Sequence, residues 1–340
     1  MKFFKTGMLA LACSCLLLAC NNNEQPQDEA ATAENQQTPR VNVPAFNADH
    51  AYAHIKTQLD FGPRVPGTPA QKNCADWMQQ QLRQYCDTVY LQQASVRGGD
   101  GKMLPCYNVI GAIHPEATRR ILLLTHWDSR PWADQDPDAA NRSTPVPAAD
   151  DGASGVGVLL EIARILKENP LSSEWGVDIF FTDVEDYGRN EWGEDSYALG
   201  TQYWAKHPHV PGYKAQAGIL LDMVGGRNAR FPLEEISRQY ARDVQQEVWA
   251  AASRAGYSSY FLYQAGGGIT DDHKYVNEMT GIPTIDIIHL RNDTRTGFAS
   301  HWHTLGDDLS IIDKNTLKAV GQTVLQYLYE KATPPAVAAR

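Results

Sequence analysis

The sequence predicts a single α/β domain, doubly wound, in which a central mixed β-sheet is flanked by helices. Two observations predict this class. Short, almost wholly apolar runs recur along the chain, as expected for the buried strands of an open sheet, at residues 121–125, 177–182, 217–221 and 282–288. Segments with apolar residues at helical spacing alternate with these runs. With 340 residues, the chain is long enough for one large domain of this kind.

The remaining elements follow from the same two patterns. Residues 152–168 carry Val156, Leu159, Leu160 and Ile162 at helical spacing, which indicates a helix with a buried face. The expected helices lie at residues 49–59, 69–85, 152–168, 236–255 and 310–329. Two further strands are expected at residues 88–93 and 106–113, before the first central strand. Alternating strands and helices of this kind favour one domain over two.

The first 19 residues have the features of an export signal. Lys2 and Lys5 precede an apolar run at residues 8–18, which is too short to span a membrane as a mature helix. The run ends in Leu-Ala-Cys at Cys20 and so resembles a bacterial lipobox, which implies cleavage before Cys20 and lipidation of that residue. An ordinary signal peptide with a chance cysteine is the alternative. We therefore expect attachment to a lipid bilayer of the bacterial cell envelope, facing the periplasm.

Composition divides the rest of the chain. Residues 20–44 follow as a polar tether with almost nothing to bury, and we expect them to be disordered after the lipidated cysteine. Residues 45–332 form the folded α/β domain in this interpretation. Residues 333–340, rich in Ala and Pro, form a flexible tail.

Charge and cysteine content narrow the function. The net charge of −10 argues against a nucleic-acid partner, because phosphate binding favours a basic surface. Three cysteines lie beyond the predicted signal and anchor, namely Cys74, Cys86 and Cys106. An odd number in an exported protein allows one disulfide and one free thiol, and spacing does not choose the pair. No Cys-x-x-Cys pair is present, so we do not expect cysteine to bind a metal.

Five groups of polar residues follow or flank the apolar runs. They are residues 125–128, 150–152, 183–186, Asp222 and residues 301–303. Each has an ordinary explanation when taken alone: an Asp caps a helix or a turn, and a single His packs in a core. Strand ends are, however, where open α/β sheets place ligands and chemistry. Carboxylates combined with imidazoles suit a divalent ion, with zinc the first expectation.

These groups resemble the motifs of the zinc aminopeptidase clan. The resemblance is carried by the run Asp-Asp-Gly-Ala-Ser-Gly at residues 150–155, by His-x-Asp at 126–128 and by the acids at 183–186. It implies a zinc aminopeptidase-like fold, a general base at Glu185, and a cis peptide after Asp151. The implied ligand positions of a two-zinc site are all held by capable residues: His126, Asp151, Asp186, Asp222 and His303.

Several segments resemble a narrower branch of that clan, the glutaminyl cyclases. They are residues 61–68, 126–130, 270–273 and 298–304, and the resemblance covers roughly residues 50–330. It implies cyclisation of N-terminal glutaminyl residues of peptides and proteins to pyroglutamate, with release of ammonia. Peptides and proteins with an N-terminal Gln are therefore the expected partners.

The cyclase resemblance also divides the roles of the site residues. It implies one Zn²⁺ per chain, a proton shuttle at Glu185, and a hydrogen bond between the acids Asp222 and Asp271. The implied zinc ligands are Asp151, Asp186 and His303, and the implied substrate-pocket walls are Trp192, Phe298 and Trp302. In that branch the residue at His126 is not a ligand. Asp286 stands where animal cyclases carry a His, so the network around the two acids must differ here.

Two other functions remain open at this point. A two-zinc exo-aminopeptidase uses the same five ligand positions, and Asp271, Phe298 and Trp302 favour the cyclase over it. A catalytically silent zinc-binding domain is a second alternative, but it predicts a lost base, whereas Glu185 is present. Whether a second metal binds at His126 and Asp222 is not decided by the sequence.

Overall fold

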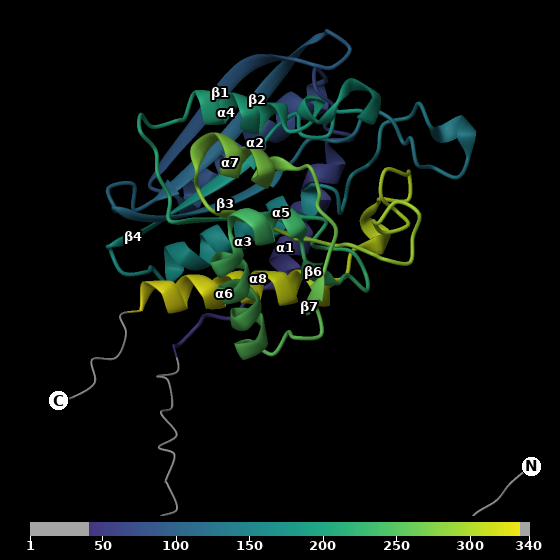
Figure 1. The fold of residues 1–340 in the computed structure, drawn as a ribbon. Helices are drawn as coiled ribbons and strands as arrows, with labels where there is room; N and C mark the ends of the chain where they lie inside the picture. The colour runs from purple at the N-terminus through teal and green to yellow at the C-terminus, as the bar shows by residue number, and fades with distance from the viewer. Residues whose placement is uncertain (1–40, 334–340) are drawn as a thin grey trace, which may run out of the picture. The chain divides into compact units, whose positions relative to one another are not determined.

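A six-stranded mixed β-sheet runs through the centre of the protein, with helices on both of its faces (Figure 1). The computed structural model describes residues 41–333. The strand order is β1-β2-β4-β3-β5-β8. The strands are β1 (Thr88–Arg97), β2 (Met103–Ile113), β3 (Arg119–His126), β4 (Trp175–Thr182), β5 (Ala217–Asp222) and β8 (Thr284–Ile288).

Four neighbouring strands, β4, β3, β5 and β8, run parallel, whereas β2 is antiparallel to both β1 and β4. Side chains alternate between the two faces, so Leu122 and Leu124 enter one apolar core and Leu123 enters the other. The predicted mixed sheet flanked by helices is therefore confirmed. Parallel strands place their carboxyl ends at one edge of the sheet, and the functional residues gather there.

The helices form two layers on this sheet. On one face, the main apolar core is shared by α1 (Ala48–Asp60), α2 (Pro69–Tyr85), α3 (Ala153–Glu168), α6 (Arg242–Arg254) and α8 (Lys314–Ala332). On the other face, α4 (Leu199–Lys206) and α7 (Asp272–Thr280) cover a smaller core through Trp204 and Val276. The short α5 (Glu235–Tyr240) contacts α6, α7 and β8.

The predicted elements are present, with one clear difference. Helix α2 has the predicted bounds because the Thr68 hydroxyl accepts a hydrogen bond from the Gln71 N–H and Pro69 opens the helix. The helix predicted at residues 236–255 is interrupted at Ala241, whose φ of −139° lies outside the helical range, and so forms α5 and α6. Helix α8 begins later than predicted, where Asp313 accepts a hydrogen bond from the Asn315 N–H.

Smaller elements complete the described chain. A two-stranded parallel sheet pairs β6 (Phe231–Leu233) with β7 (Phe261–Ala265). Single 3-10 turns form at Ala139–Asn141, Asn190–Trp192, Glu194–Ser196 and Leu309–Ile311.

None of the helices within residues 41–333 is long and apolar enough to cross a membrane. The predicted signal peptide, the lipidated Cys20, most of the tether and residues 334–340 lie outside the described residues.

The three cysteines of the domain are all buried free thiols. Cys74 lies in α2, Cys86 ends that helix, and Cys106 lies in β2. The disulfide that the sequence allowed is therefore not formed among residues 41–333. Burial raises the pKa of both Cys74 and Cys86 to about 12, so these thiols are protonated at neutral pH.

Candidate active site and metal centre

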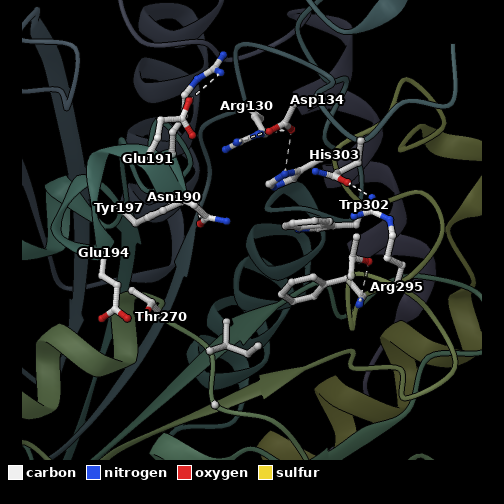
Figure 2. A pocket seen from close by; sticks show the side chains of 16 residues that line it. Arg130, Asp134, Asn190, Glu191, Glu194, Tyr197, Thr270, Arg295, Trp302 and His303 are labelled. Carbon is white, nitrogen blue, oxygen red and sulfur yellow. Dashed lines mark hydrogen bonds and ion pairs between the residues drawn. The ribbon is translucent and has the colours of Figure 1, made fainter. Parts of the chain in front are cut away.

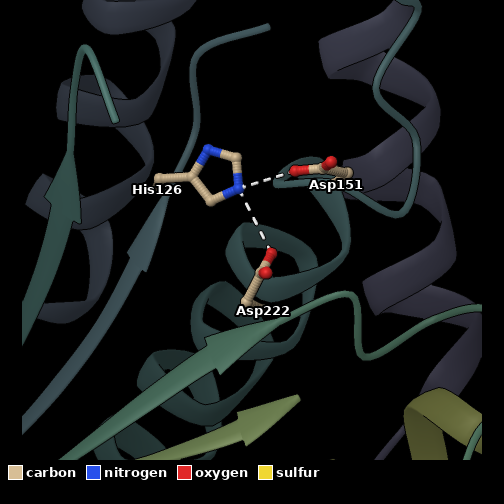
Figure 3. Close-up of side chains that lie close together, drawn as sticks. All are labelled: His126, Asp151 and Asp222. Atoms are coloured by element: carbon tan, nitrogen blue, oxygen red, sulfur yellow. Dashed lines mark hydrogen bonds and ion pairs between the residues drawn. The ribbon is translucent and has the colours of Figure 1, made fainter. Parts of the chain in front are cut away.

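The carboxyl edge of the parallel strands brings the predicted site residues together. His126 is the last residue of β3 and Asp222 is the last residue of β5. Residues 183–186 follow β4 directly, and residues 150–152 precede α3. Figure 3 shows the side chains of His126, Asp151 and Asp222 pointing toward one another from three different segments.

Asp151 lies between two histidines. The Nε2 atom of His126 is 3.0 Å from Asp151 Oδ1 and 3.2 Å from Asp222 Oδ1. The other oxygen of Asp151, Oδ2, is 3.7 Å from Nε2 of His303, which in turn is 3.4 Å from Asp186 Oδ1. Two sets of donors result, each within 4.8 Å: Asp151, Asp186 and His303, and also His126, Asp151 and Asp222.

The first donor set fits a zinc ion. Asp151, Asp186 and His303 are all buried, with 5%, 3% and 4% of their surface exposed. Buried carboxylates at this spacing repel each other unless a cation or protons compensate their charge. Imidazole nitrogens and carboxylate oxygens both bind zinc, and a catalytic site with three protein ligands leaves the fourth position open for substrate. Asp151, Asp186 and His303 would therefore hold the metal.

Asp307 holds the loop that carries Asp151. Its Oδ1 accepts a hydrogen bond from the Asp150 N–H at 2.8 Å, and its Oδ2 accepts one from the Asp151 N–H at 3.2 Å. Asp150 points away from the metal set, with its carboxylate 2.9 Å from His301 Nε2. The predicted cis peptide after Asp151 is wrong, since residues 41–333 contain no cis bond. A trans peptide already places Asp151 between the two histidines.

Asp128 holds the loop that follows β4. Its Oδ1 accepts a hydrogen bond from the Glu185 N–H at 3.0 Å, and its Oδ2 accepts one from the Asp186 N–H at 3.1 Å. The same carboxylate lies 3.6 Å from His126 Nδ1. One buried side chain therefore fixes the backbone of the predicted base and of one metal ligand.

The backbone is strained at three points of the site. Val184, Met223 and His303 adopt left-handed conformations, with φ values of 55°, 47° and 55°. Such conformations cost of order 1–3 kcal/mol in a residue other than glycine. His303 is a predicted ligand, Val184 adjoins Glu185, and Met223 adjoins Asp222. The surrounding contacts therefore maintain these conformations at the points where the side chains converge.

Arg130 and Asp134 support the ligands His303 and Asp186. Arg130 Nη1 donates to Asp186 Oδ1 at 2.7 Å, and its Nε donates to Asp134 Oδ1 at 2.9 Å. Asp134 Oδ1 also lies 3.3 Å from Nδ1 of His303, which orients that imidazole. Burial opposes the ionised form of Asp186, but the charges of His303 and Arg130 outweigh it and lower its pKa.

Glu185 has a different environment from its neighbour Asp186. Burial, followed by the charge of Asp271, raises the pKa of the Glu185 carboxyl well above its ordinary value. Its carboxyl group lines a cavity rather than forming an ion pair. The two adjacent acids therefore differ in their chemistry. Asp186 is a carboxylate of low pKa beside a cation, whereas Glu185 is a carboxyl group of high pKa that can exchange a proton.

Three further buried acids of this region, Asp222, Asp271 and Asp286, have raised pKa values. Burial and the charge of Asp222 raise the pKa of Asp271, and burial raises the pKa of Asp222 to about 6. Asp271 Oδ2 and both carboxyl oxygens of Asp286 are buried without a hydrogen-bond partner in the described part of the chain. The predicted hydrogen bond between Asp222 and Asp271 is not formed there. Instead, Asp271 Oδ1 accepts from the Asp272 N–H and so caps α7.

Most of the predicted site residues line a narrow cavity of about 60 Å³. Its lining includes Asp151, Glu185, Asp186, Asp222, Asp271, Phe298, Trp302 and His303. The rings of Phe298 and Trp302 stack with their centroids 4.3 Å apart at its wall. The cavity opens into an outer cleft of about 570 Å³, which Figure 2 shows with its lining side chains. Tyr197, Ile269 and Thr270 belong to both.

Trp192 is the one predicted pocket residue that lines neither space. Its ring packs 6.0 Å from the ring of Trp132 and 6.2 Å from that of Tyr187. Trp192 ends a 3-10 turn that is followed by Gly193 with a φ of 84°. This turn holds the indole against the other two rings and away from the cavity. Tyr197, from the following segment, stands at the cavity instead.

The comparisons with known proteins agree with this geometry. Residues 108–328 match the profile of peptidase family M28. The chain belongs to peptidase family M28.

Two solved structures and one curated relative show how close the similarity is. The M28 chain is 48% identical to the glutaminyl cyclase of Bacteroides thetaiotaomicron bound to N-acetylhistamine, with a TM-score of 0.82 over 85% of this chain and 99% of that chain. It is 51% identical to a Zn-dependent exopeptidase from Parabacteroides distasonis, with a TM-score of 0.83 over 85% and 99% of the two chains. It is 26% identical to the glutaminyl-peptide cyclotransferase of Drosophila melanogaster, over 77% of this chain and 76% of that protein. The family resemblance inferred from the sequence is thereby confirmed, and zinc is the metal that this family and donor set support.

Sequence reasoning missed several supporting residues of this M28 protein. Asp307 contacts Asp150 across 157 positions of sequence, and no local motif marks it. Arg130 was part of a segment that carried the cyclase resemblance, but its contacts with Asp134 and Asp186 had no sequence signal. These residues act through tertiary contacts, which only the assembled loops create.

Proposed function

We propose that this M28 protein is a zinc-dependent glutaminyl-peptide cyclotransferase, an enzyme of the acyltransferase class. It converts the N-terminal glutaminyl residue of peptides and proteins to pyroglutamate and releases ammonia. The observation that carries the proposal is the narrow cavity, where Glu185, the zinc ligands and the stacked rings of Phe298 and Trp302 meet. The similarity to a bacterial glutaminyl cyclase over almost the whole of that chain supports it.

The chain's own residues supply binding and proton transfer. The N-terminal Gln enters the cavity, and the aromatic rings of Phe298 and Trp302 exclude bulk water around it. The α-amine then attacks the γ-carbonyl carbon of the same residue, a C–N bond forms, and the bond to the amide nitrogen breaks. Asp151, Asp186 and His303 would hold a zinc ion, which would supply Lewis-acid chemistry for the γ-carbonyl group.

Glu185 carries the proton that this reaction must move. It accepts a proton from the attacking amine and gives it to the departing ammonia, so no water is consumed. Its raised pKa, caused by burial and Asp271, suits a group that must both accept and donate near neutral pH. A positioned acid–base group of this type contributes roughly 10²–10⁴-fold to the rate. The charge of Asp271 helps to maintain the high pKa of Glu185, and the charge of Asp222 in turn raises the pKa of Asp271.

A second candidate function is a two-zinc exo-aminopeptidase. One specific observation favours it: His126, Asp151 and Asp222 form a second donor set that shares Asp151 with the first. The similarity to a protein described as a Zn-dependent exopeptidase is in line with it. Against it stand Asp271, Phe298 and Trp302, which line the cavity and belong to the segments that resemble the cyclase branch.

The decisive experiment is to incubate the purified protein with a Gln-Xaa dipeptide and to weigh the products. Cyclisation shifts the whole dipeptide down by the mass of one ammonia, whereas aminopeptidase activity releases free Gln. Mass loss without free Gln is the expected result. Free Gln, or an unchanged dipeptide with the zinc-loaded protein, would contradict the proposal.

We also infer that one zinc is held per chain, by Asp151, Asp186 and His303. His126 Nε2 already lies at hydrogen-bonding distance from both Asp151 and Asp222, at 3.0 and 3.2 Å, and so is engaged with the two carboxylates. Elemental analysis after exhaustive dialysis is expected to give one zinc per chain. Two tightly held ions would contradict this inference and favour the aminopeptidase.

We further propose that Cys20 carries a lipid and anchors the protein to the bacterial cell envelope, facing the periplasm. The support is the apolar run that precedes Cys20 and the polar segment that follows it. Radiolabelled palmitate added to expressing cells is expected to label the full chain but not a Cys20→Ala variant. Equal labelling of both proteins would overturn the proposal.

A further inference from the structure

The path of the substrate outside the cavity follows from the proposed function. A Gln residue in the narrow cavity has its own carbonyl pointing back toward the entrance, because the α-amine and side chain must meet inside. The cavity and the outer cleft share Tyr197, Thr270 and Trp302 at their junction. The second and third residues of a peptide therefore lie in the outer cleft. Side chains of that cleft can select among peptides.

Most charged side chains of the outer cleft already have a partner of opposite charge. Arg130 pairs with Asp134 at 2.8 Å. Arg189 pairs with Glu191 at 3.4 Å, and Glu194 pairs with Lys274 at 2.6 Å. Such pairs offer little net charge to a ligand.

Arg295 is the exception in the cleft. Its Nη2 donates to the neutral side-chain oxygen of Gln135 at 2.6 Å, and no carboxylate within residues 41–333 lies within 4.0 Å of its guanidinium. Its side chain is exposed to the cleft. An Arg has several N–H donors in a fixed fork, and only one of them is used here. The remaining donors and the uncompensated charge are free for a ligand.

The guanidinium of Arg295 is also held in place relative to the reaction site. The Gln135 N–H donates to the backbone oxygen of His303 at 3.1 Å, so Gln135 connects Arg295 to a zinc ligand. The loop of Arg295 is closed by a hydrogen bond from the Arg291 N–H to the Gly297 oxygen at 2.7 Å. Figure 2 shows Arg295 on the same side of the cleft as Trp302, opposite Tyr197 and Glu194.

We propose that Arg295 is a specificity-determining residue that binds a carboxylate of the substrate just beyond the N-terminal Gln. The preferred substrates are then peptides with Asp or Glu at the second or third position. The guanidinium fork matches a carboxylate with two parallel hydrogen bonds. The C-terminal carboxylate of a dipeptide offers the same chemistry, and the experiment separates the two sources.

The test compares kcat/KM for matched peptides with a C-terminal amide: Gln-Glu-Ala, Gln-Gln-Ala and Gln-Lys-Ala. The wild-type protein is expected to favour Glu over Gln at the second position by about two- to fivefold, as for an exposed ion pair, and to disfavour Lys. A parallel comparison of Gln-Ala with and without the amide reports on the terminal carboxylate. High ionic strength is expected to weaken both preferences.

Variants at two arginines of one loop make the test specific. Arg295→Gln is expected to abolish the preference for Glu, and Arg295→Glu to reverse it in favour of Lys. Arg291→Gln is the matched control, because Arg291 already pairs with Asp293 at 2.7 Å and does not line the cleft. It is expected to retain the wild-type ratio.

The outcomes are decisive for this inference alone. A wild-type protein that cyclises all the peptides with equal kcat/KM overturns the role of Arg295, as does a preference that survives in Arg295→Gln. A preference confined to the free dipeptide carboxylate identifies the chain terminus, not an acidic side chain, as the ligand, and so overturns the predicted substrate class. Failure of the wild-type protein to cyclise any peptide instead refutes the proposed function.

Discussion

The two adjacent acids Glu185 and Asp186 differ in their chemistry because their surroundings differ. Arg130 and His303 stabilise the charge of Asp186, whereas burial and Asp271 raise the pKa of Glu185. We predict that Glu185→Gln lowers kcat for cyclisation by at least about 10²-fold, because an amide cannot accept and return a proton. Zinc content should remain that of the wild type, since the ligands are intact.

A coupled ammonia assay with metal analysis of the same samples checks this prediction. Glu116→Gln provides the control, because Glu116 is an exposed acid in the turn between β2 and β3, at the opposite edge of the sheet. Turnover of Glu185→Gln within tenfold of the wild-type value would show that another group moves the proton.

Asp128 acts on the metal centre through the backbone. Its two oxygens accept the N–H groups of Glu185 and Asp186, and an Asn at this position would present an amide donor to one of them. We predict that Asp128→Asn lowers zinc affinity by about 10–100-fold, as for other residues that support metal ligands. Competition with a chelator of known affinity measures this change. Unchanged affinity would contradict it, and Asp60→Asn, at the exposed end of α1, serves as the control.

The residues of the site differ in how visible they are from sequence. Glu185, Asp186 and Asp222 adjoin apolar strands, so hydrophobic pattern and strand-end chemistry located them. Phe298 and Trp302 were identified only through a family resemblance. Trp192 was assigned to the pocket in the same way, but its ring packs on Trp132 and Tyr187, because the conformation of its turn directs it there. Loop conformation is not encoded in a short motif.

At the scale of elements, Glu234 joins two helices. It caps α5 by accepting from the Ile236 N–H at 2.9 Å, and it also accepts from the Ile269 N–H at 3.0 Å, just before α7. His273 of α7 lies 3.1 Å from its carboxylate. Burial opposes ionisation, but the hydrogen bond and charge of His273 lower the pKa of Glu234 to about 2.

The depressed pKa of Glu234 fixes the sign of a pH effect. The carboxylate stabilises the folded protein fully above the unfolded-state pKa of about 4.3, and this stabilisation is lost as pH falls toward about 2. We predict that Glu234→Gln lowers the free energy of unfolding by about 1–3 kcal/mol at neutral pH, and that it flattens the decline in acid. Urea titrations at several pH values measure both. Glu235→Gln, which changes the exposed neighbouring acid, serves as the control. If the free energies of unfolding of Glu234→Gln and the wild type changed in parallel with pH, the role assigned to Glu234 would be refuted.

The elements themselves were largely predictable because strand and helix periodicities are local. The buried strands β3, β4 and β5 are short apolar runs, and α2 has both a Thr cap and an opening Pro. Helix α7 was missed because it is short and polar, although its cap Asp271 and its final left-handed Gly281 were signals that could have located it. The break at Ala241 has no Gly or Pro to mark it, so packing of α5 on β8 and α7 explains it better than local preference.

At the scale of the whole molecule, the three proposed zinc ligands lie on segments that are distant in the sequence. Asp151 precedes α3, Asp186 follows β4, and His303 lies in the loop before α8, so a zinc ion bound by them would connect three distant parts of the chain. Binding to the folded state alone stabilises it by about 2.7 kcal/mol when free zinc is one hundred times its dissociation constant. For a domain of this size that corresponds to a rise in unfolding temperature of roughly 4–5 °C.

We predict that removing the metal with a chelator lowers the unfolding temperature by this amount and that added zinc restores it. Differential scanning calorimetry on the holoprotein, the chelated protein and the reloaded protein measures the change. In Asp186→Asn, which lacks a ligand carboxylate, the chelator is expected to shift the transition by far less. Identical transitions with and without chelator would mean that the acids are held together by shared protons. In that case, a hydrogen-bonded acid network would be what closes this edge of the sheet.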